Sequence, residues 1–254
     1  MANVDFHNVP LYDFLSVLPQ LHNEKIVVSA DAIDFIFWKC EEYQLSATVR
    51  FHTVALLNKY LNSLLSKHTG KVRVPMLLRA VSCLQIVTKS HETGCLSVND
   101  ILQMINSSLT AGVNLLTKQD VVNAELEILD ALNYDISVNY CFPHLELMLE
   151  FFRQCFACEF PKRTHSICFL LLVCLLHMDS RTNGSILFKC SHIDLSLSVI
   201  KTSLILVKVS SDLFEQLVER LNFMFEKQGS KIEISPQKID YLSSLLFKSI
   251  TSND

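Results

Sequence analysis

Apolar residues recur at helical spacing along most of the chain. Between residues 29 and 133, five segments carry apolar side chains three or four positions apart, as expected of helices that bury one face. The third segment is apolar on nearly every side, which predicts a helix surrounded by other helices. The five predicted helices span residues 29–43, 48–65, 75–90, 97–105 and 117–133.

Capping residues support several of these boundaries. Ser29 and Ser97 stand where a side chain caps the first turn of a helix. Pro75 suits the first turn of the third helix, because its missing N–H has no partner there anyway. Thr117 and Asp120 form a capping-box pattern before the fifth helix.

A second series of five helices is predicted after the short connection 134–140. Pro143 opens it, and Ser235 followed by Pro236 marks the start of its last helix. We predict an all-α fold of two tandem five-helix bundles, with a lead-in at 1–29, one bundle at 30–138 and another at 139–254. No residue-level repeat relates the two halves, so the duplication rests on element count. The helices of the second series are expected at 143–156, 162–178, 192–208, 212–227 and 236–250.

Composition narrows the classes of function. The 254 residues contain 5 Gly and 6 Pro, which suits helices joined by short turns. The net charge is −4 and no run of Lys or Arg is present, so direct nucleic-acid binding is not expected. The longest apolar stretch, 167–178, is shorter than the ~20 residues that cross a membrane, so no membrane association is expected.

The nine cysteines are odd in number and lie among apolar neighbours. The first 20 residues lack the pattern of a signal peptide, so reduced thiols in a cytosolic or nuclear compartment are expected. Cys155 and Cys158 form half of a zinc motif, but no second pair follows, so no metal is predicted. Catalytic motifs and glycine-rich phosphate loops are absent, so we expect no cofactor and no enzymatic activity.

One carboxylate stands out on the fifth predicted helix. A helical projection places Glu125 at the centre of an apolar side, opposite Asn123, Glu127 and Asp130. A carboxylate buried there needs a partner. One interpretation is an internal salt bridge or a half-exposed edge, and the other is a group that binds a partner protein.

Lys89 ends the only polar strip of the third helix, which also contains Ser82 and Gln85. A Lys in the last turn is favoured by the helix dipole, which accounts for it without any function. Its functional interpretation therefore depends on a resemblance to a known family.

Several stretches resemble the cyclin box of the cyclin family. In the first half, the resemblance is nearly complete. In the second, the segment 198–200 and the helix after it resemble the third helix of a second, divergent box. The first-half stretches are 41–45 (EEYQL), 58–61 (NKYL), 84–89 (LQIVTK) and 122–134 (VNAELEILDALNY).

The resemblance implies a non-catalytic regulatory subunit that binds a cyclin-dependent kinase. In cyclins, the residues that match Lys89 and Glu125 hold backbone groups beside the regulatory helix of the kinase. Leu129 and Ile136 match apolar positions that supply buried contact area. The implied partner-binding residues are thus Lys89, Glu125, Leu129 and Ile136.

The chain departs from the cyclin pattern in three places. Asp31 and Ala32 replace large apolar residues of a substrate-docking patch, and Ser90 stands where an aromatic residue is usual. Lys89 and Glu125 are 36 positions apart, several more than in typical cyclins. We expect the additional length in a loop at 107–116.

Two stretches, 79–85 (RAVSCLQ) and 124–129 (AELEIL), are most similar to a meiotic branch of the cyclin family. That resemblance implies a role in meiotic crossover formation in the nucleus, alongside meiotic recombination proteins. A second hypothesis is a cyclin-fold interaction scaffold that activates no kinase. A DNA-binding cyclin fold would require a basic face, and a helical enzyme would require a cleft with converging titratable groups.

Overall fold

The computed structural model describes residues 27–66, 75–91, 96–107, 116–156, 161, 163–182, 190–227 and 234–251. Most of the predicted lead-in at 1–29 lies outside the described residues. So do Cys158 and positions 108–115 of the loop predicted to hold the additional length.

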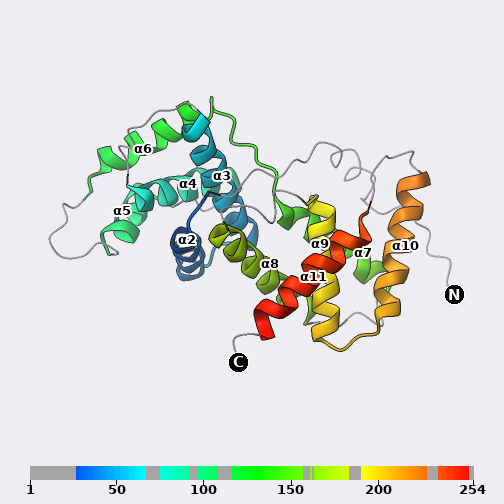
Figure 1. Ribbon diagram of the computed structural model, residues 1–254. Helices are drawn as coiled ribbons and strands as arrows, with labels where there is room; N and C mark the ends of the chain where they lie inside the picture. The colour runs from blue at the N-terminus through cyan, green and yellow to red at the C-terminus, as the bar shows by residue number, and fades with distance from the viewer. Residues whose placement is uncertain are drawn as a thin grey trace. The chain divides into compact units, whose positions relative to one another are not determined.

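The described residues form ten α-helices and no strand, which confirms the predicted all-α class (Figure 1). Contacts divide the chain into two compact units. The first unit contains helices α2 to α6, the residues up to 140 and the short segment 179–182, which includes the end of α8. The second unit contains α7, the rest of α8, α9, α10 and α11. The helices are α2 (Ala30–Glu42), α3 (Ala47–Ser66), α4 (Met76–His91), α5 (Val98–Asn106), α6 (Lys118–Ala131), α7 (Cys141–Cys155), α8 (Thr164–Arg181), α9 (His192–Leu206), α10 (Ser211–Lys227) and α11 (Pro236–Thr251).

Helix α4 is the centre of the first unit. It packs against α2, α3, α5 and α6. Every residue from Leu78 to Thr88 is buried, which confirms the prediction of a helix surrounded by others. The polar residues of this stretch are therefore buried with the apolar ones, and the exposed residues of α4 are Met76 at its start and Lys89, Ser90 and His91 in its last turn.

The predicted caps of the first unit are present. The Ser29 hydroxyl accepts the Ala32 N–H at 3.3 Å and begins α2. Ser97 and Thr117 each complete a capping box, with Asp100 and Asp120 as the reciprocal partners. These caps set the entry points of α5 and α6.

Several boundaries differ from the prediction. In the second unit, α7 begins at Cys141, two residues before the predicted opening residue Pro143. Helix α8 spans Thr164–Arg181 instead of 162–178.

Two boundaries of the first unit also differ. Pro75 lies just before α4 rather than in its first turn, and its carbonyl accepts the Arg79 N–H at 3.1 Å. Helix α6 ends at Ala131 instead of Asn133, because Asn133 and Tyr134 both adopt left-handed backbone angles, with φ of 52° and 60°. This turn directs the chain out of α6 toward residues 135–140.

Helix α9 is the centre of the second unit and packs against α7, α10 and α11. Residues 192 to 200 and 202 to 204 are buried. The Ser191 side chain caps its start by accepting the Asp194 N–H at 3.0 Å. Each unit is thus built around one almost fully buried helix.

Candidate partner-binding site

Lys89 and Glu125 form an ion pair between two helices of the first unit. Lys89 lies in the last turn of α4, and Glu125 lies near the middle of α6. The Lys89 Nζ is 2.5 Å from the Glu125 Oε1. The lysine side chain is 43% exposed and the glutamate side chain 17%, so the pair lies at the surface with the carboxylate more sheltered.

The buried side of α6 is narrower than the projection predicted. Val121, Ala124 and Ile128 face the core, whereas Val122 is 37% exposed. Glu125 therefore lies at the border of the buried side and not at its centre. The surrounding helices decide which part of an apolar side is buried, and the sequence of α6 alone does not contain that information.

The exposed border of α6 carries an apolar stripe around Glu125. Val122, Glu125, Leu126 and Leu129 are spaced three and four positions apart, which places them in one row along the helix. Leu126 is 47% exposed, and Leu129 is half-buried. Exposed apolar side chains in a row next to a charged pair are typical of a surface that binds a protein.

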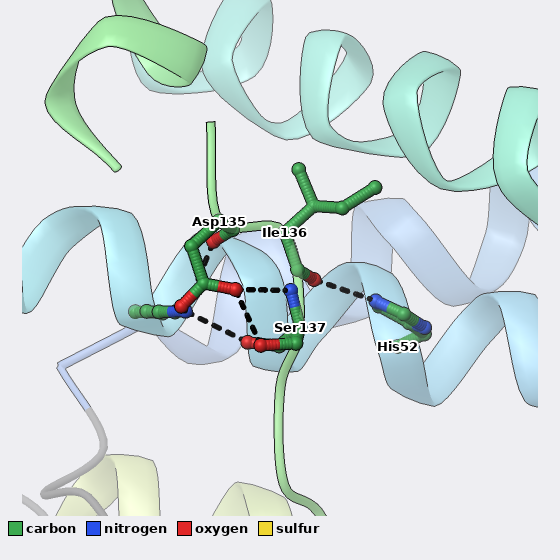
Figure 2. A network of polar contacts seen from close by, with 5 residues as sticks. His52, Asp135, Ile136 and Ser137 are labelled. Atoms are coloured by element: carbon green, nitrogen blue, oxygen red, sulfur yellow. Dashed lines mark hydrogen bonds and ion pairs between the residues drawn. The ribbon is translucent and has the colours of Figure 1, made fainter. Parts of the chain in front are cut away.

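Ile136 lies beyond α6 in a segment that is attached to α3 (Figure 2). Its side chain is half-buried, and its carbonyl oxygen is 3.4 Å from the His52 Nε2. Lys59, also on α3, donates to the carbonyl oxygens of Asp135 at 2.9 Å and Ser137 at 2.7 Å. The segment on both sides of Ile136 is thus held through its backbone.

Asp135 adds side-chain bonds to the same network. Its Oδ2 accepts from the Lys59 Nζ at 2.8 Å, and its Oδ1 accepts from the Ser137 N–H at 3.1 Å and from the Ser137 hydroxyl. These bonds, first that from Lys59, lower the pKa of Asp135 to about 2. The carboxylate therefore stays ionised over the whole physiological range.

His52 also contacts the end of α4. The His91 Nε2 is 2.7 Å from the His52 Nδ1, and His91 is two residues beyond Lys89. Burial lowers the pKa of His52, and the proximity of His91 lowers it further. His52 is accordingly neutral near pH 7.

Of the four predicted site residues, three lie close together on α4 and α6, and Ile136 lies on a separate segment. Lys89 and Glu125 are in contact, and Leu129 lies one turn of α6 beyond Glu125. Ile136 belongs to a different element and is held by α3. No spacing pattern in the sequence relates Lys59 or His52 to the segment after α6, so these supporting residues were not predicted.

Tyr60 and Glu127 form another contact that the sequence did not reveal. The Tyr60 hydroxyl donates to the Glu127 Oε1 at 2.7 Å, so Glu127 is half-buried although the projection placed it on the polar side. Arg79 lies nearby, with its guanidinium carbon 5.5 Å from the centre of the Tyr60 ring. Burial and the bond to Glu127 raise the pKa of Tyr60, so its hydroxyl remains a donor.

Within the described residues, no three His, Cys, Asp or Glu side chains converge in a way that could hold a metal ion. Among the described helices, none combines the length and the hydropathy that a membrane span requires.

The described residues thus form an all-helical fold with an exposed ion pair and an apolar stripe beside it. The family model for the cyclin N-terminal domain matches residues 2–137, and the chain therefore belongs to this family. Domains of this kind are generally regulatory and not enzymatic. The match contains the whole of the candidate site.

The similarity to a solved structure extends over both units. The X-ray structure of a viral cyclin from herpesvirus saimiri matches 94% of this chain and 97% of its own, with a TM-score of 0.55 and 16% sequence identity. This likeness shows a cyclin fold across the two five-helix bundles. No curated protein matches the chain.

Proposed function

We propose that this chain is a regulatory subunit that binds a cyclin-dependent kinase through Lys89, Glu125, Leu129 and Ile136. The observation that carries the proposal is the Lys89–Glu125 pair beside the apolar stripe of α6. In this arrangement, a donor and an acceptor stand next to each other at a surface with exposed apolar side chains.

The chemistry of the pair suits recognition of a main-chain segment. A lysine ammonium has three donor hydrogens, and a carboxylate has two acceptor oxygens. Lys89 can therefore donate to a carbonyl oxygen of the partner, and Glu125 can accept a backbone N–H, while the two stay in contact. Binding of this kind selects one placement of the kinase helix and shifts its population toward that state.

An exchange of the two charges tests the proposal. The double variant Lys89→Glu with Glu125→Lys retains an internal ion pair, but presents the partner with an acceptor and a donor in the wrong order. Two lost charge-assisted bonds at about 1.5–3 kcal/mol each predict at least a hundredfold weaker binding. The measurement is recovery of a cyclin-dependent kinase on the full-length tagged chain, with thermal unfolding to verify the fold.

The second unit offers a matched control. Lys201 of α9 and Asp240 of α11 also form an ion pair between helices. The exchange Lys201→Asp with Asp240→Lys should leave kinase recovery unchanged. Equal recovery with the wild type and the Lys89/Glu125 exchange would contradict the proposed binding mode.

A finer proposal concerns the biological process. The stretches 79–85 and 124–129 resemble cyclin N-terminal domain-containing protein 1, which supports a role in meiotic crossover formation in the nucleus. Affinity purification of the tagged chain from germ-line tissue should then recover a kinase together with meiotic recombination proteins. Recovery of neither class would contradict this role.

A cyclin-fold scaffold without a kinase is the second candidate. Two observations favour it: the Ser90 hydroxyl donates to the Val87 carbonyl of its own helix at 2.8 Å, and Asp31 is exposed where a docking patch would be apolar. Both features remove apolar contact area from surfaces that cyclins use. Recovery of recombination proteins without any kinase would support this candidate.

A further inference from the structure

We propose that Lys59 and His52 form a clamp that holds residues 135–137 in place and so positions Ile136 for its partner. The clamp deepens the proposed function, because Ile136 is one of the residues proposed to contact the kinase. Lys59 and His52 are positioning residues here, since they act on the backbone around Ile136 and are not proposed to touch the partner.

The chain reaches Ile136 through a strained turn. Asn133 and Tyr134 both have positive φ values, although neither is glycine and Tyr134 is bulky. Asn tolerates left-handed backbone, but it is unfavourable for Tyr and persists where surrounding contacts hold it. The Tyr134 N–H donates to the Leu129 carbonyl at 2.8 Å, and this bond closes the last turn of α6. The side chain of Tyr134 is 63% exposed, so it provides little packing that would hold the turn.

Lys59 supplies the restraint on the far side of this turn. Its ammonium group donates to three oxygens at 2.7–2.9 Å, two of Asp135 and one of Ser137. A lysine has three donor hydrogens, so all of them are used on this one segment. The Lys59 side chain is 22% exposed and that of Asp135 is 59% exposed, so the lysine is the more sheltered partner of a surface ion pair.

His52 restrains the same segment at its middle and connects it to α4. The Ile136 carbonyl can only accept, so the His52 Nε2 carries the hydrogen. The His52 Nδ1 is then the acceptor, and the His91 Nε2 donates to it. This relay runs from the turn of α4 that carries Lys89 to the backbone of Ile136, and thus couples the two ends of the candidate site.

A restraint on the free chain favours binding because a segment that is already ordered loses less entropy when a partner binds. Loss of the clamp should therefore weaken binding through Ile136 while the helices stay intact. The direct signature of the clamp is local: order of the Ile136 side chain and slow exchange of the Ser137 amide hydrogen, which is bonded to Asp135.

Nuclear magnetic resonance of the full-length chain measures that signature without any partner. The variants are Lys59→Met and His52→Leu, which remove the donors with little change in volume. We expect the rate of amide hydrogen exchange at Ser137 to rise at least tenfold in each variant. The chemical shift of the Ile136 δ1-methyl group should move toward the value of an isoleucine side chain that exchanges freely among its rotamers. The imidazole nitrogens of wild-type His52 should report the Nε2–H tautomer.

Three controls separate a local clamp from general destabilisation. Lys59→Arg retains a cation with several donors and should restore slow exchange at Ser137. Lys248→Met removes an exposed lysine of α11 and should change neither signal. Protection of the buried Ile128 amide should stay within twofold of the wild type in every variant.

Unchanged exchange and methyl signals in both Lys59→Met and His52→Leu would overturn the clamp, and so would an Nδ1–H tautomer for His52. A binding measurement then tests its purpose with the kinase recovered on the wild-type chain. We expect Lys59→Met to weaken that binding about tenfold and Lys59→Arg to restore it. If wild type binds no kinase, the proposed function fails, while the exchange result still decides whether the clamp exists.

Discussion

Helices α4 and α9 are the buried centres of their units, yet they treat their polar side chains differently. In α9, hydroxyl groups donate to carbonyls of the preceding turn: Ser198 to Asp194 at 2.5 Å and Thr202 to Ser198 at 2.8 Å. Ser203 donates to Ile200 at 2.7 Å. These three hydroxyl groups of α9 form their hydrogen bonds within the helix and need no partner on a neighbouring helix.

In α4, several buried polar atoms have no hydrogen-bond partner among the described residues. They are the Nε and Nη2 of Arg79, the Oγ of Ser82 and the Oε1 of Gln85. Arg79 is 2% exposed and Ser82 and Gln85 are 0% and 1% exposed, so desolvation of these groups is only partly offset, in the case of Arg79 by the Tyr60 ring.

The number of buried polar atoms without a hydrogen-bond partner thus differs between α4 and α9, and this difference affects the stability of the two units. A buried polar group without a partner costs about 1–3 kcal/mol. Among the described residues, four such atoms lie on α4, whereas on α9 the Nδ1 of His192 is one, so α4 carries the larger part of this cost. The first unit also carries the candidate site at the end of the same helix.

The largest expected effect comes from cavity-forming substitutions, which test whether the two units unfold independently. Leu84 of α4 and Leu197 of α9 are both buried, and truncation of either to Ala should cost about 3 kcal/mol through a cavity. Trp38, the only tryptophan, lies on α2 and reports on the first unit. Leu84→Ala should shift the denaturant midpoint of Trp38 fluorescence, whereas Leu197→Ala should shift only the circular dichroism signal. A shift of the Trp38 midpoint by Leu197→Ala would show that the units unfold together.

A pH experiment gives the second effect. Burial and the nearby His144 lower the pKa of His192, the first residue of α9, to about 3. The unfolded chain binds this proton below about pH 6.5 and the folded chain does not, so stability is complete above pH 6.5 and falls as the pH drops toward 3. Between pH 6.5 and 5 the loss should be about 2 kcal/mol, measured by urea unfolding.

The variant His192→Leu is the control for the pH experiment. It removes the titrating group, and the Nδ1 that has no hydrogen-bond partner, from a buried position. The acid-dependent loss of stability should then shrink by the same amount. An unchanged slope in His192→Leu would assign the pH dependence to other groups.

The third effect concerns the buried charge of α4. Arg79→Met retains much of the side-chain volume and removes the donors that have no partner. We expect the first unit to become about 1 kcal/mol more stable, because a buried charge without full compensation is replaced by an apolar group. The Trp38 midpoint measures this change. A clear loss of stability would mean that the Arg79 contact with Tyr60 outweighs its desolvation.

The smallest effect is a matched pair of serine substitutions. Ser82→Ala removes an unpartnered hydroxyl from α4 and should stabilise by a few tenths to about 1 kcal/mol. Ser198→Ala removes a bonded hydroxyl from α9 and should destabilise by a similar amount. Thermal unfolding of both variants provides the comparison. Changes of the same sign would contradict the contrast between the two helices.

Most of the fold could be predicted because its signals are local. Each helix is specified by spacing within a few turns and by caps within three residues, as Ser29, Ser97 and Thr117 illustrate. The segment 75–90, which is apolar on nearly every side, likewise predicted a central helix. One member of the Lys89–Glu125 pair followed in the same way, since the projection of its own helix marked Glu125 as a carboxylate on an apolar side.

The amino-acid sequence by itself thus determined the ten helices, their caps and the carboxylate that needs a partner. Only the tertiary structure decided which side of α6 is buried, and that Glu125 meets Lys89. It also decided that Lys59 bonds Asp135, 76 positions away, and that His52 meets His91, 39 positions away. These contacts join separate elements, so they depend on how the helices pack and not on any local pattern.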